Sequence, residues 1–215
     1  MQITQEAWDD VHGGELPMGE VKVARGEEVG YMVNREIWSE VPIGMSWELT
    51  GKGPVSVRWV DQNKGGEGAM EVRCRLVARD LKGKDKGRDD LFAATPPLEA
   101  KRMLLSRAAT ITVGSCSRKL LFIDAKKAHL KPRCGEDLFI ELPEECGVAP
   151  GVCGKLNLWI YGFGKAAVAW EELYSDKLVE ISFKRKVTCV VVFYFADTDI
   201  SLFLHGDDFT FCGCG

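Results

Sequence analysis

The strongest hydrophobic pattern in the chain runs from Val187 to Cys212. Two runs rich in Val, Ile, Phe and Tyr flank Ala196-Asp197-Thr198-Asp199, and such runs on either side of a turn-forming tetrapeptide are typical of an antiparallel hairpin. Both runs are almost wholly apolar. We therefore expect this hairpin to be buried.

Two adjacent carboxylates interrupt the second run. The apolar stretch from Ile200 to Leu204 breaks at His205-Gly206-Asp207-Asp208 and resumes at Phe209. Two like charges about 4 Å apart repel by roughly 4 kcal/mol at an effective dielectric constant of about 20, so a buried or half-buried pair needs compensation, usually from a divalent cation. The alternative is that Asp207 and Asp208 form a solvated turn with the help of Gly206.

A second hairpin is expected between residues 55–61 and 70–79, because both stretches alternate apolar and polar residues and a Gly-rich segment joins them. Alternation along the second strand places Cys74 and Leu76 on one face. It places Arg73 and Arg75 together on the other face, so two guanidinium groups project side by side.

Further patterns predict helices and short strands. A helix is expected from Leu98 to about residue 111, opened by Thr95 and Pro96-Pro97 and with Leu98, Met103, Leu105, Ala108 and Ala109 on its apolar side. A second, core-facing helix is predicted by the spacing of Trp170, Leu173, Tyr174, Leu178 and Ile181. A short strand is expected at 138–142. Residues 1–50 are expected to form an acidic N-terminal extension, with a short helix at 29–39, packed on the main domain.

Asp124 follows Lys119-Leu120-Leu121-Phe122-Ile123, which has the pattern of a buried strand. A buried strand that ends in a lone carboxylate holds that carboxylate rigidly, as a metal ligand requires. Alternatively, Asp124 caps the turn that follows it.

Composition and charge narrow the class of protein. Eight cysteines contain no CxxC pair, so neither a zinc ribbon nor a disulfide scaffold fits, and most of them are expected to be reduced core thiols. The sequence shows neither a membrane span nor a signal peptide, which predicts an intracellular protein without a membrane partner. The net charge of −4 argues against nucleic-acid binding through bulk charge alone. Basic residues nevertheless cluster at 73–88 and 118–133.

Six segments, taken in order, resemble the copia-type retrotransposon reverse transcriptases, and the resemblance runs from about Val55 to Phe211. The segment RCRLVAR at 73–79 resembles KARLVAR, and LFAATP at 91–96 resembles the FxPV region. The segment IDAKKAHL at 123–130 is similar to DVKTAFL, and EDLFIELP at 136–143 to EEIYMxxP. Residues 155–170 are similar to KLxKxLYGLKQAxRxW, and His205-Gly206-Asp207-Asp208 occupies the place of YVDD.

The resemblance implies an α+β fold with the fingers and a partial palm of a right-hand polymerase: an antiparallel sheet with packed helices, without the thumb. The fingers and palm would span residues 51–215. It implies an RNA-directed DNA polymerase in which Asp124, Asp207 and Asp208 hold two Mg²⁺ ions, or Mn²⁺ in their place, while Arg73, Arg75 and His129 contact the nucleotide. The implied partners are an RNA template, a DNA primer and dNTPs. The implied location is a cytoplasmic retrotransposon particle or the nucleus.

The sequence also departs from the family pattern. His129 replaces an aromatic residue, and His205-Gly206 replaces Tyr-Val. The chain ends at Gly215, soon after the Asp-Asp hairpin, so we expect this fragment to be weak or inactive by itself. The competing hypothesis is a relic or adopted domain that binds nucleic acid without catalysis.

Overall fold

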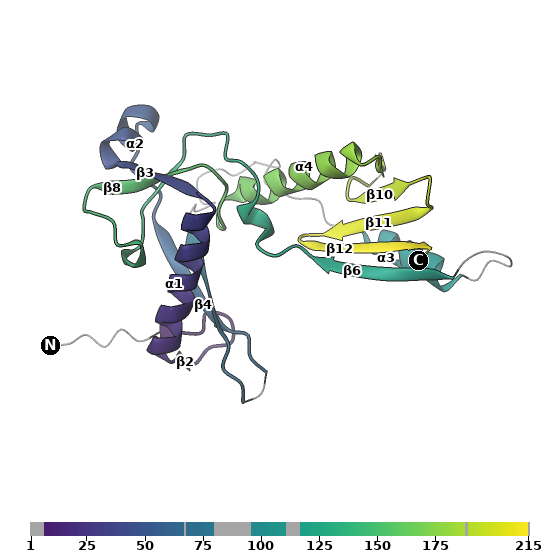
Figure 1. Cartoon of the computed structure of the whole chain (residues 1–215), viewed down its shortest axis with the longest axis horizontal. Coiled ribbons are helices and arrows are strands. Elements are labelled where there is room, and N and C mark those ends of the chain that lie inside the picture. The colour runs from purple at the N-terminus through teal and green to yellow at the C-terminus, as the bar shows by residue number, and fades with distance from the viewer. Residues whose placement is uncertain (1–6, 67, 80–95, 111–116, 188, 215) are drawn as a thin grey trace. The chain divides into compact units, whose positions relative to one another are not determined.

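The computed structural model describes residues 7–66, 68–79, 96–110, 117–187 and 189–214 (Figure 1). They fall into two compact units, each assembled from two separate stretches of chain. Unit 1 contains the described residues within 1–86 and 132–166, and unit 2 those within 87–131 and 167–215. No helix among the described residues is both long enough and apolar enough to cross a membrane.

Unit 1 is built from a small hairpin, two helices and two further sheets. The hairpin consists of β1 (Ala7–Trp8) and β2 (Glu15–Leu16), and the helices are α1 (Met18–Asn34) and α2 (Ile43–Thr50). Strands β4 (Val57–Asn63) and β5 (Val72–Ala78) pair in antiparallel fashion, as predicted. The third sheet has the order β3 (Trp38–Pro42), β8 (Val152–Leu156), β7 (Phe139–Ile140). A short 3-10 turn, η3 (Glu144–Cys146), completes the unit.

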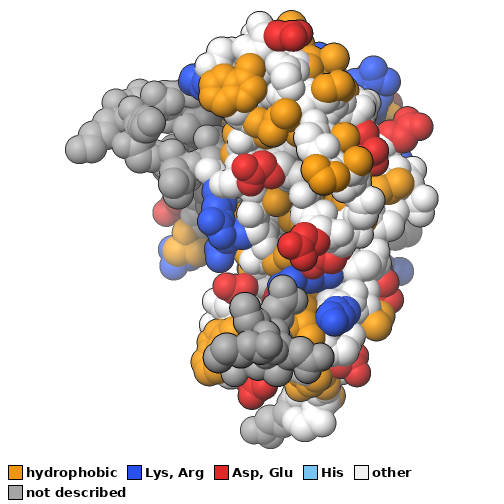
Figure 2. Space-filling model, turned by 90° about the vertical axis from the view of Figure 1, so that its left-hand side faces the viewer, with side chains coloured by type: hydrophobic (Ala, Val, Ile, Leu, Met, Phe, Trp, Pro, Cys, Tyr) orange, Lys and Arg blue, Asp and Glu red, His pale blue; other side chains and the backbone are white. Residues whose placement is uncertain are grey.

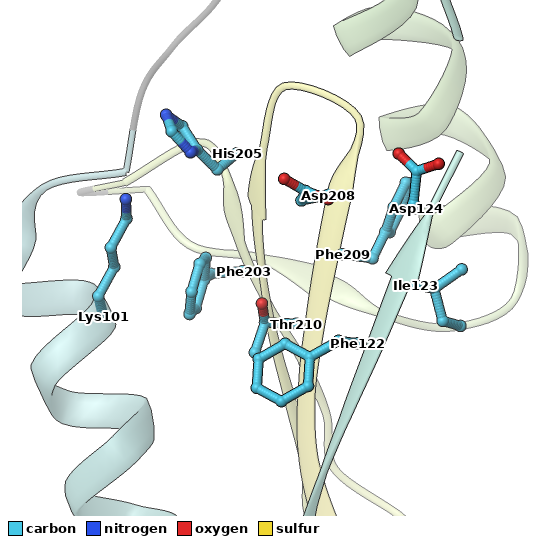
Figure 3. A pocket seen from close by; sticks show the side chains of 9 residues that line it. All are labelled: Lys101, Phe122, Ile123, Asp124, Phe203, His205, Asp208, Phe209 and Thr210. Carbon is cyan, nitrogen blue, oxygen red and sulfur yellow. The ribbon is translucent and has the colours of Figure 1, made fainter. Parts of the chain in front are cut away.

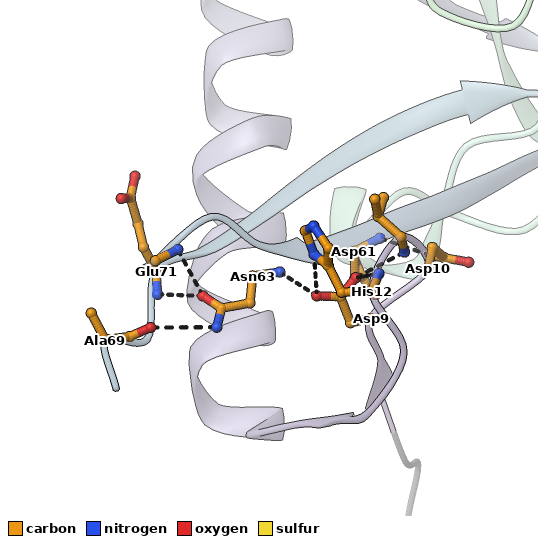
Figure 4. Close-up of polar contacts among 9 residues, drawn as sticks. Asp9, Asp10, His12, Asp61, Asn63, Ala69 and Glu71 are labelled. Atoms are coloured by element: carbon orange, nitrogen blue, oxygen red, sulfur yellow. Dashed lines mark hydrogen bonds and ion pairs between the residues drawn. The ribbon is translucent and has the colours of Figure 1, made fainter. Parts of the chain in front are cut away.

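The segment that joins β1 to β2 is held against β4 by hydrogen bonds that involve two aspartates (Figure 4). The carboxylate of the buried Asp9 accepts hydrogen bonds from the backbone N–H groups of His12, Val11 and Asn63. Those from His12 and Asn63 contribute most to holding the pKa of Asp9 well below its usual range. Asp10 exchanges two hydrogen bonds with the backbone of Asp61. The acidic character of this segment is therefore partly structural, because these carboxylates satisfy backbone donors.

A buried ion pair ties α1 to β4. Arg25 donates to Asp61, with 2.6 Å between Nη2 and Oδ2, and to Glu145 at 3.0 Å. The guanidinium also lies over the Trp59 ring, 5.2 Å from its centroid. Asp61 is 4% exposed, so its charge depends on Arg25 for compensation.

Unit 2 is a five-stranded antiparallel sheet with a helix on each face. The strand order is β6 (Arg118–Asp124), β12 (Asp208–Cys214), β11 (Ile200–His205), β10 (Val192–Phe195), β9 (Lys184–Arg185). Helix α4 (Gly164–Glu180) packs on one face, where Trp170, Tyr174 and Leu178 meet Leu202 and Leu204. Helix α3 (Leu98–Ala109) packs on the other face, where Leu104 meets Phe203 and Cys212. Because alternate residues of β11 belong to the two clusters, the sheet is covered from both sides.

The end of the sheet at the β10–β11 turn is held by Asp199. Its carboxylate accepts hydrogen bonds from Arg118 at 2.8 Å, from Arg107 of α3, and from the Tyr194 hydroxyl at 2.9 Å. The two arginines, Arg118 first, hold the pKa of Asp199 well below its ordinary range. One side chain thus joins the turn, β6 and α3.

The predicted α+β class with antiparallel sheets is confirmed. Both predicted hairpins are present, and the two predicted helices correspond to α3 and α4. The helix expected at 29–39 is wrong, because α1 begins at Met18 and ends at Asn34, and residues from Trp38 form β3. Glycines at 19, 26 and 30 look like helix breaks in sequence. They are tolerated because Val21, Val29 and Met32 form a buried stripe, and packing of such a stripe outweighs a weak intrinsic propensity.

Three details of packing also differ from expectation. Leu98, Met103 and Leu105 are exposed, and α3 instead buries Leu104 with Ala100 and Ala108, which follow helical spacing. Ile181 lies beyond the end of α4 and is 62% exposed. The strand expected at 138–142 is limited to Phe139–Ile140.

Candidate active site

The turn between β11 and β12 consists of Gly206 and Asp207. His205 and Asp208 face each other across it in the antiparallel register, so only two residues form the loop. Gly206 has φ +67°, whereas Asp207 has a negative φ. This combination is that of a type II′ turn, in which glycine is preferred at the first central position. The alternative of a solvated turn is confirmed for Asp207 together with Gly206, whereas Asp208 is the first residue of β12.

Asp124 lies directly opposite Asp208. Strand β6 pairs with β12 so that Asp124 and Asp208 are partners, and facing side chains in such a ladder have Cβ atoms about 4.5–5.5 Å apart. The backbone N–H of Ala125 donates to the carbonyl of Asp207 at 2.9 Å, which brings the turn against the end of β6. Asp124 therefore meets Asp207 and Asp208, which lie far from it in sequence, at one end of the sheet, and all three are exposed to solvent.

A pocket of about 440 Å³ opens at this end of the sheet (Figure 3). Asp124 and Asp208 stand at the ends of their adjacent strands, with Lys101 of α3 and His205 on the other side of the pocket. Its remaining walls are formed by Phe122, Ile123, Phe203, Phe209 and Thr210. The pocket thus combines two carboxylates, a cation and aromatic rings, all from unit 2.

Helix α4 contacts the turn between β11 and β12 through Trp170. The indole N–H of the buried Trp170 donates to the carbonyl of Gly206 at 3.0 Å. The Trp170 and Tyr174 rings pack edge-to-face against Phe209, with centroids 6.2 and 5.9 Å away. These contacts fix the beginning of β12 on the helix.

The donor set at this end of the sheet fits a hard divalent cation. Carboxylate oxygens are the protein ligands that Mg²⁺ and Mn²⁺ prefer, and the exposure of all three aspartates leaves them accessible. Among the described residues, no three His, Cys, Asp or Glu side chains are already arranged around a common metal position. A cation would therefore be held first by Asp124 and Asp208, which face each other, with Asp207 turning toward it.

The prediction that 119–123 forms a buried strand is wrong in part. The strand exists as β6, but Leu121, Phe122 and Ile123 are 56%, 68% and 45% exposed. In the described sheet β6 is an edge strand that pairs with β12, and α3 covers it near Leu120. Likewise, Asp207 and Asp208 are exposed rather than half-buried, so solvent screens the repulsion expected between them. Both runs of the hairpin are buried as expected, at 191–193 and at 201–204, but Val187 is 98% exposed.

The residues expected to contact a nucleotide are divided between the two units. Arg73 and Arg75 lie exposed on one face of β5, as predicted, and belong to unit 1. Arg73 forms an ion pair with Glu71 at 2.6 Å, and Arg75 lies 5.7 Å from the centroid of the Tyr161 ring. His129 is half-buried in the 3-10 turn η2 (Ala128–Leu130) of unit 2. Their contacts with a nucleotide stay predictions.

Sequence reasoning missed Lys101, Phe122 and Thr210 as pocket residues, and it missed the contact of Trp170 with the turn. The alternation of β6 and β12 could have identified Phe122 and Thr210, because each lies two residues from a pocket aspartate on the same face of its strand. Lys101 and Trp170 come from helices on the two faces of the sheet, and nothing in a single sequence shows where those helices lie.

A family model described as "Reverse transcriptase (RNA-dependent DNA polymerase)" matches residues 46–214, which is well over half of the chain. The match includes every pocket residue as well as Arg73, Arg75 and His129. Reverse transcriptases of this family generally use divalent metal ions and bind RNA, DNA and dNTPs. The chain therefore belongs to the copia-type reverse transcriptases, a family of RNA-dependent DNA polymerases.

Proposed function

We propose that the chain carries the nucleotidyl-transfer centre of a copia-like retrotransposon polyprotein, with Asp124, Asp207 and Asp208 as its catalytic carboxylates. In this reaction a bond forms between the primer 3′-oxygen and the α-phosphorus of a dNTP. The bond from that phosphorus to pyrophosphate breaks, and the 3′-hydroxyl proton is lost. The observation that carries the proposal is the pairing of Asp124 opposite Asp208, beside Asp207, at the rim of a pocket.

The three aspartates would hold two Mg²⁺ ions, or Mn²⁺ in their place. When bound, such ions lower the pKa of the attacking hydroxyl and neutralise charge on the triphosphate. The aspartates themselves concentrate negative charge at one end of a rigid sheet, so divalent cations and the phosphates that accompany them are bound in preference to a bare triphosphate. The pairing of β6 with β12 keeps Asp124 and Asp208 in place on paired strands.

The basic residues would bind the remaining parts of the substrate. Arg73 and Arg75 would contact the nucleotide phosphates, since guanidinium groups match phosphate oxygens in both geometry and charge. Phosphate would have to displace Glu71 from Arg73, and an exposed ion pair of this kind contributes only about 0–1 kcal/mol. His129 would lie beside the nucleotide sugar. An RNA template and a DNA primer would follow the basic segments of the chain.

In this proposal unit 2 is the palm and the β4–β5 hairpin of unit 1 belongs to the fingers, with residues 1–50 as an N-terminal extension. Acidic, basic and hydrophobic side chains are interspersed on the side of the molecule shown in Figure 2. We place the protein in a cytoplasmic retrotransposon particle or the nucleus.

Primer extension on an RNA template in Mg²⁺ tests the proposal. The comparison uses this chain, a longer chain that continues through the family's thumb region, and Asp207→Asn and Asp124→Asn in both. Asp197→Asn is the matched control, because Asp197 is an exposed aspartate in the turn at the opposite end of β11. We expect Mg²⁺-dependent extension by at least one of the two chains without substitutions.

Extension should be lost in Asp207→Asn and Asp124→Asn and retained in Asp197→Asn. Binding of primer and template without extension by any chain would favour the non-catalytic alternative. Extension that survives both active-site substitutions would refute the assignment of the carboxylates.

A further inference from the structure

The direction of the Asp207 side chain depends on one peptide group. In a two-residue turn the peptide between the central residues can point either way, and a flip of it converts a type II′ turn into a type I′ turn. Gly206 accepts positive φ in both forms. Asp207 has negative φ in the form observed here and would have positive φ in the other, which Asp adopts more readily than most residues. The backbone alone therefore leaves two orientations open to Asp207.

Trp170 contacts the group that would have to rotate. Its indole N–H donates to the Gly206 carbonyl at 3.0 Å, and that carbonyl is one half of the peptide between Gly206 and Asp207. Trp170 is only 7% exposed, and its ring is enclosed by Tyr174 and Phe209. A flip would turn the carbonyl away and leave a buried donor without its acceptor. That loss disfavours the flipped form by roughly five- to 150-fold.

A second hydrogen bond holds the other side of the same residue. The carbonyl of Asp207 accepts from the N–H of Ala125, at 2.9 Å, directly after Asp124. Asp207 is thus fixed at its preceding peptide by α4 and at its following peptide by the end of β6. The first of these restraints comes from a side chain and can be removed by substitution.

We propose that Trp170 is a positioning residue for Asp207: its indole N–H selects the observed type II′ conformer of the turn and so sets the direction from which the Asp207 side chain reaches a cation held by Asp124 and Asp208. The inference rests on the proposed function, because it concerns the cation centre of that function. Trp170 touches neither substrate nor cation in this proposal. It acts through the Gly206-Asp207 peptide alone.

Nuclear magnetic resonance on the unaltered chain gives the first test. The amide protons of Gly206 and Asp207 lie close together in a type I′ turn but not in a type II′ turn. We expect a weak nuclear Overhauser effect between them and slow hydrogen exchange at the Trp170 indole N–H. A strong effect between these amides, or indole exchange as fast as in a free tryptophan, would overturn the inference without any variant.

The second test compares Trp170→Phe with Tyr174→Phe, a donor-removing change to another buried ring in the same cluster. In Trp170→Phe we expect the amide contact of the flipped turn to appear. We also expect the affinity for Mn²⁺, followed by electron paramagnetic resonance, to fall by a factor no larger than the roughly five- to 150-fold change in the ratio of the two turn conformers. Asp207→Asn should weaken Mn²⁺ binding in the unaltered chain but add little to Trp170→Phe, since the two changes share one cause. Tyr174→Phe should change neither readout.

The outcomes separate the two proposals. Trp170→Phe with an unflipped turn and unchanged Mn²⁺ affinity overturns the role of Trp170 and leaves the carboxylate centre intact. A flip in Trp170→Phe, together with no Mn²⁺ binding by the unaltered chain, supports the role of Trp170 in orienting Asp207 and refutes the cation centre.

Discussion

Replacing Asp208 by Asn should stabilise the chain when no divalent cation is present. Asp124 and Asp208 face each other, so their Cβ atoms lie about 5 Å apart, and we take this as the separation of their charges. At that distance two like charges repel by roughly 0.8 kcal/mol in bulk water and roughly 3 kcal/mol at an effective dielectric constant of about 20. Because both side chains are exposed, we expect a gain near the lower figure, about 1 kcal/mol in the free energy of unfolding.

Urea unfolding at low ionic strength with a chelator measures this gain. Asp197→Asn is the control, because it removes an exposed aspartate in the turn at the other end of β11. The gain from Asp208→Asn should vanish in about 1 M salt, where the Debye length falls to about 3 Å. Millimolar Mg²⁺ should reverse the order of stability, because a cation that binds only the folded state stabilises the unaltered chain more than the variant. Lower stability of Asp208→Asn in chelator, with equal stabilisation of both proteins by Mg²⁺, would refute this reasoning.

Two further predictions concern the ion pairs. Arg25→Met should lower the free energy of unfolding by about 3 kcal/mol, because it leaves the buried Asp61 carboxylate uncompensated. Arg73→Met breaks an exposed ion pair and should change the free energy of unfolding by less than about 1 kcal/mol. Urea unfolding of both variants measures this difference. Asp199→Asn should destabilise unit 2 by about 1 kcal/mol at neutral pH, allowing for solvent screening of this partly exposed group. Because folding lowers the pKa of Asp199, its stabilising effect is complete above the ordinary aspartate pKa of about 4 and is lost as the pH falls toward the lower folded value. Unfolding measured from pH 6 to pH 2 should therefore show a smaller loss of stability in Asp199→Asn than in the unaltered chain. Equal losses in the two proteins would contradict this role of Asp199.

The sequence predicted what depends on local pattern. The two hairpins followed from alternation and turn residues, and the end of β6 at Asp124 followed from the break in an apolar run. The predictions that were wrong concern packing between elements. Exposure of Phe122 follows from the edge position of β6, because an apolar run in sequence looks the same whether or not a neighbour covers it. The pairing of Asp124 with Asp208 is likewise a register between distant segments, and only the family resemblance pointed to it.

The pairing of β6 with β12 also has a consequence for the order in which the protein is made. These strands are roughly 80 residues apart in sequence, so the ribosome releases β6 several seconds before its partner at ordinary rates of synthesis. During that interval the apolar side chains of Leu121, Phe122 and Ile123 have no partner strand beside them. The acidic centre is completed only when Asp207 and Asp208 have emerged.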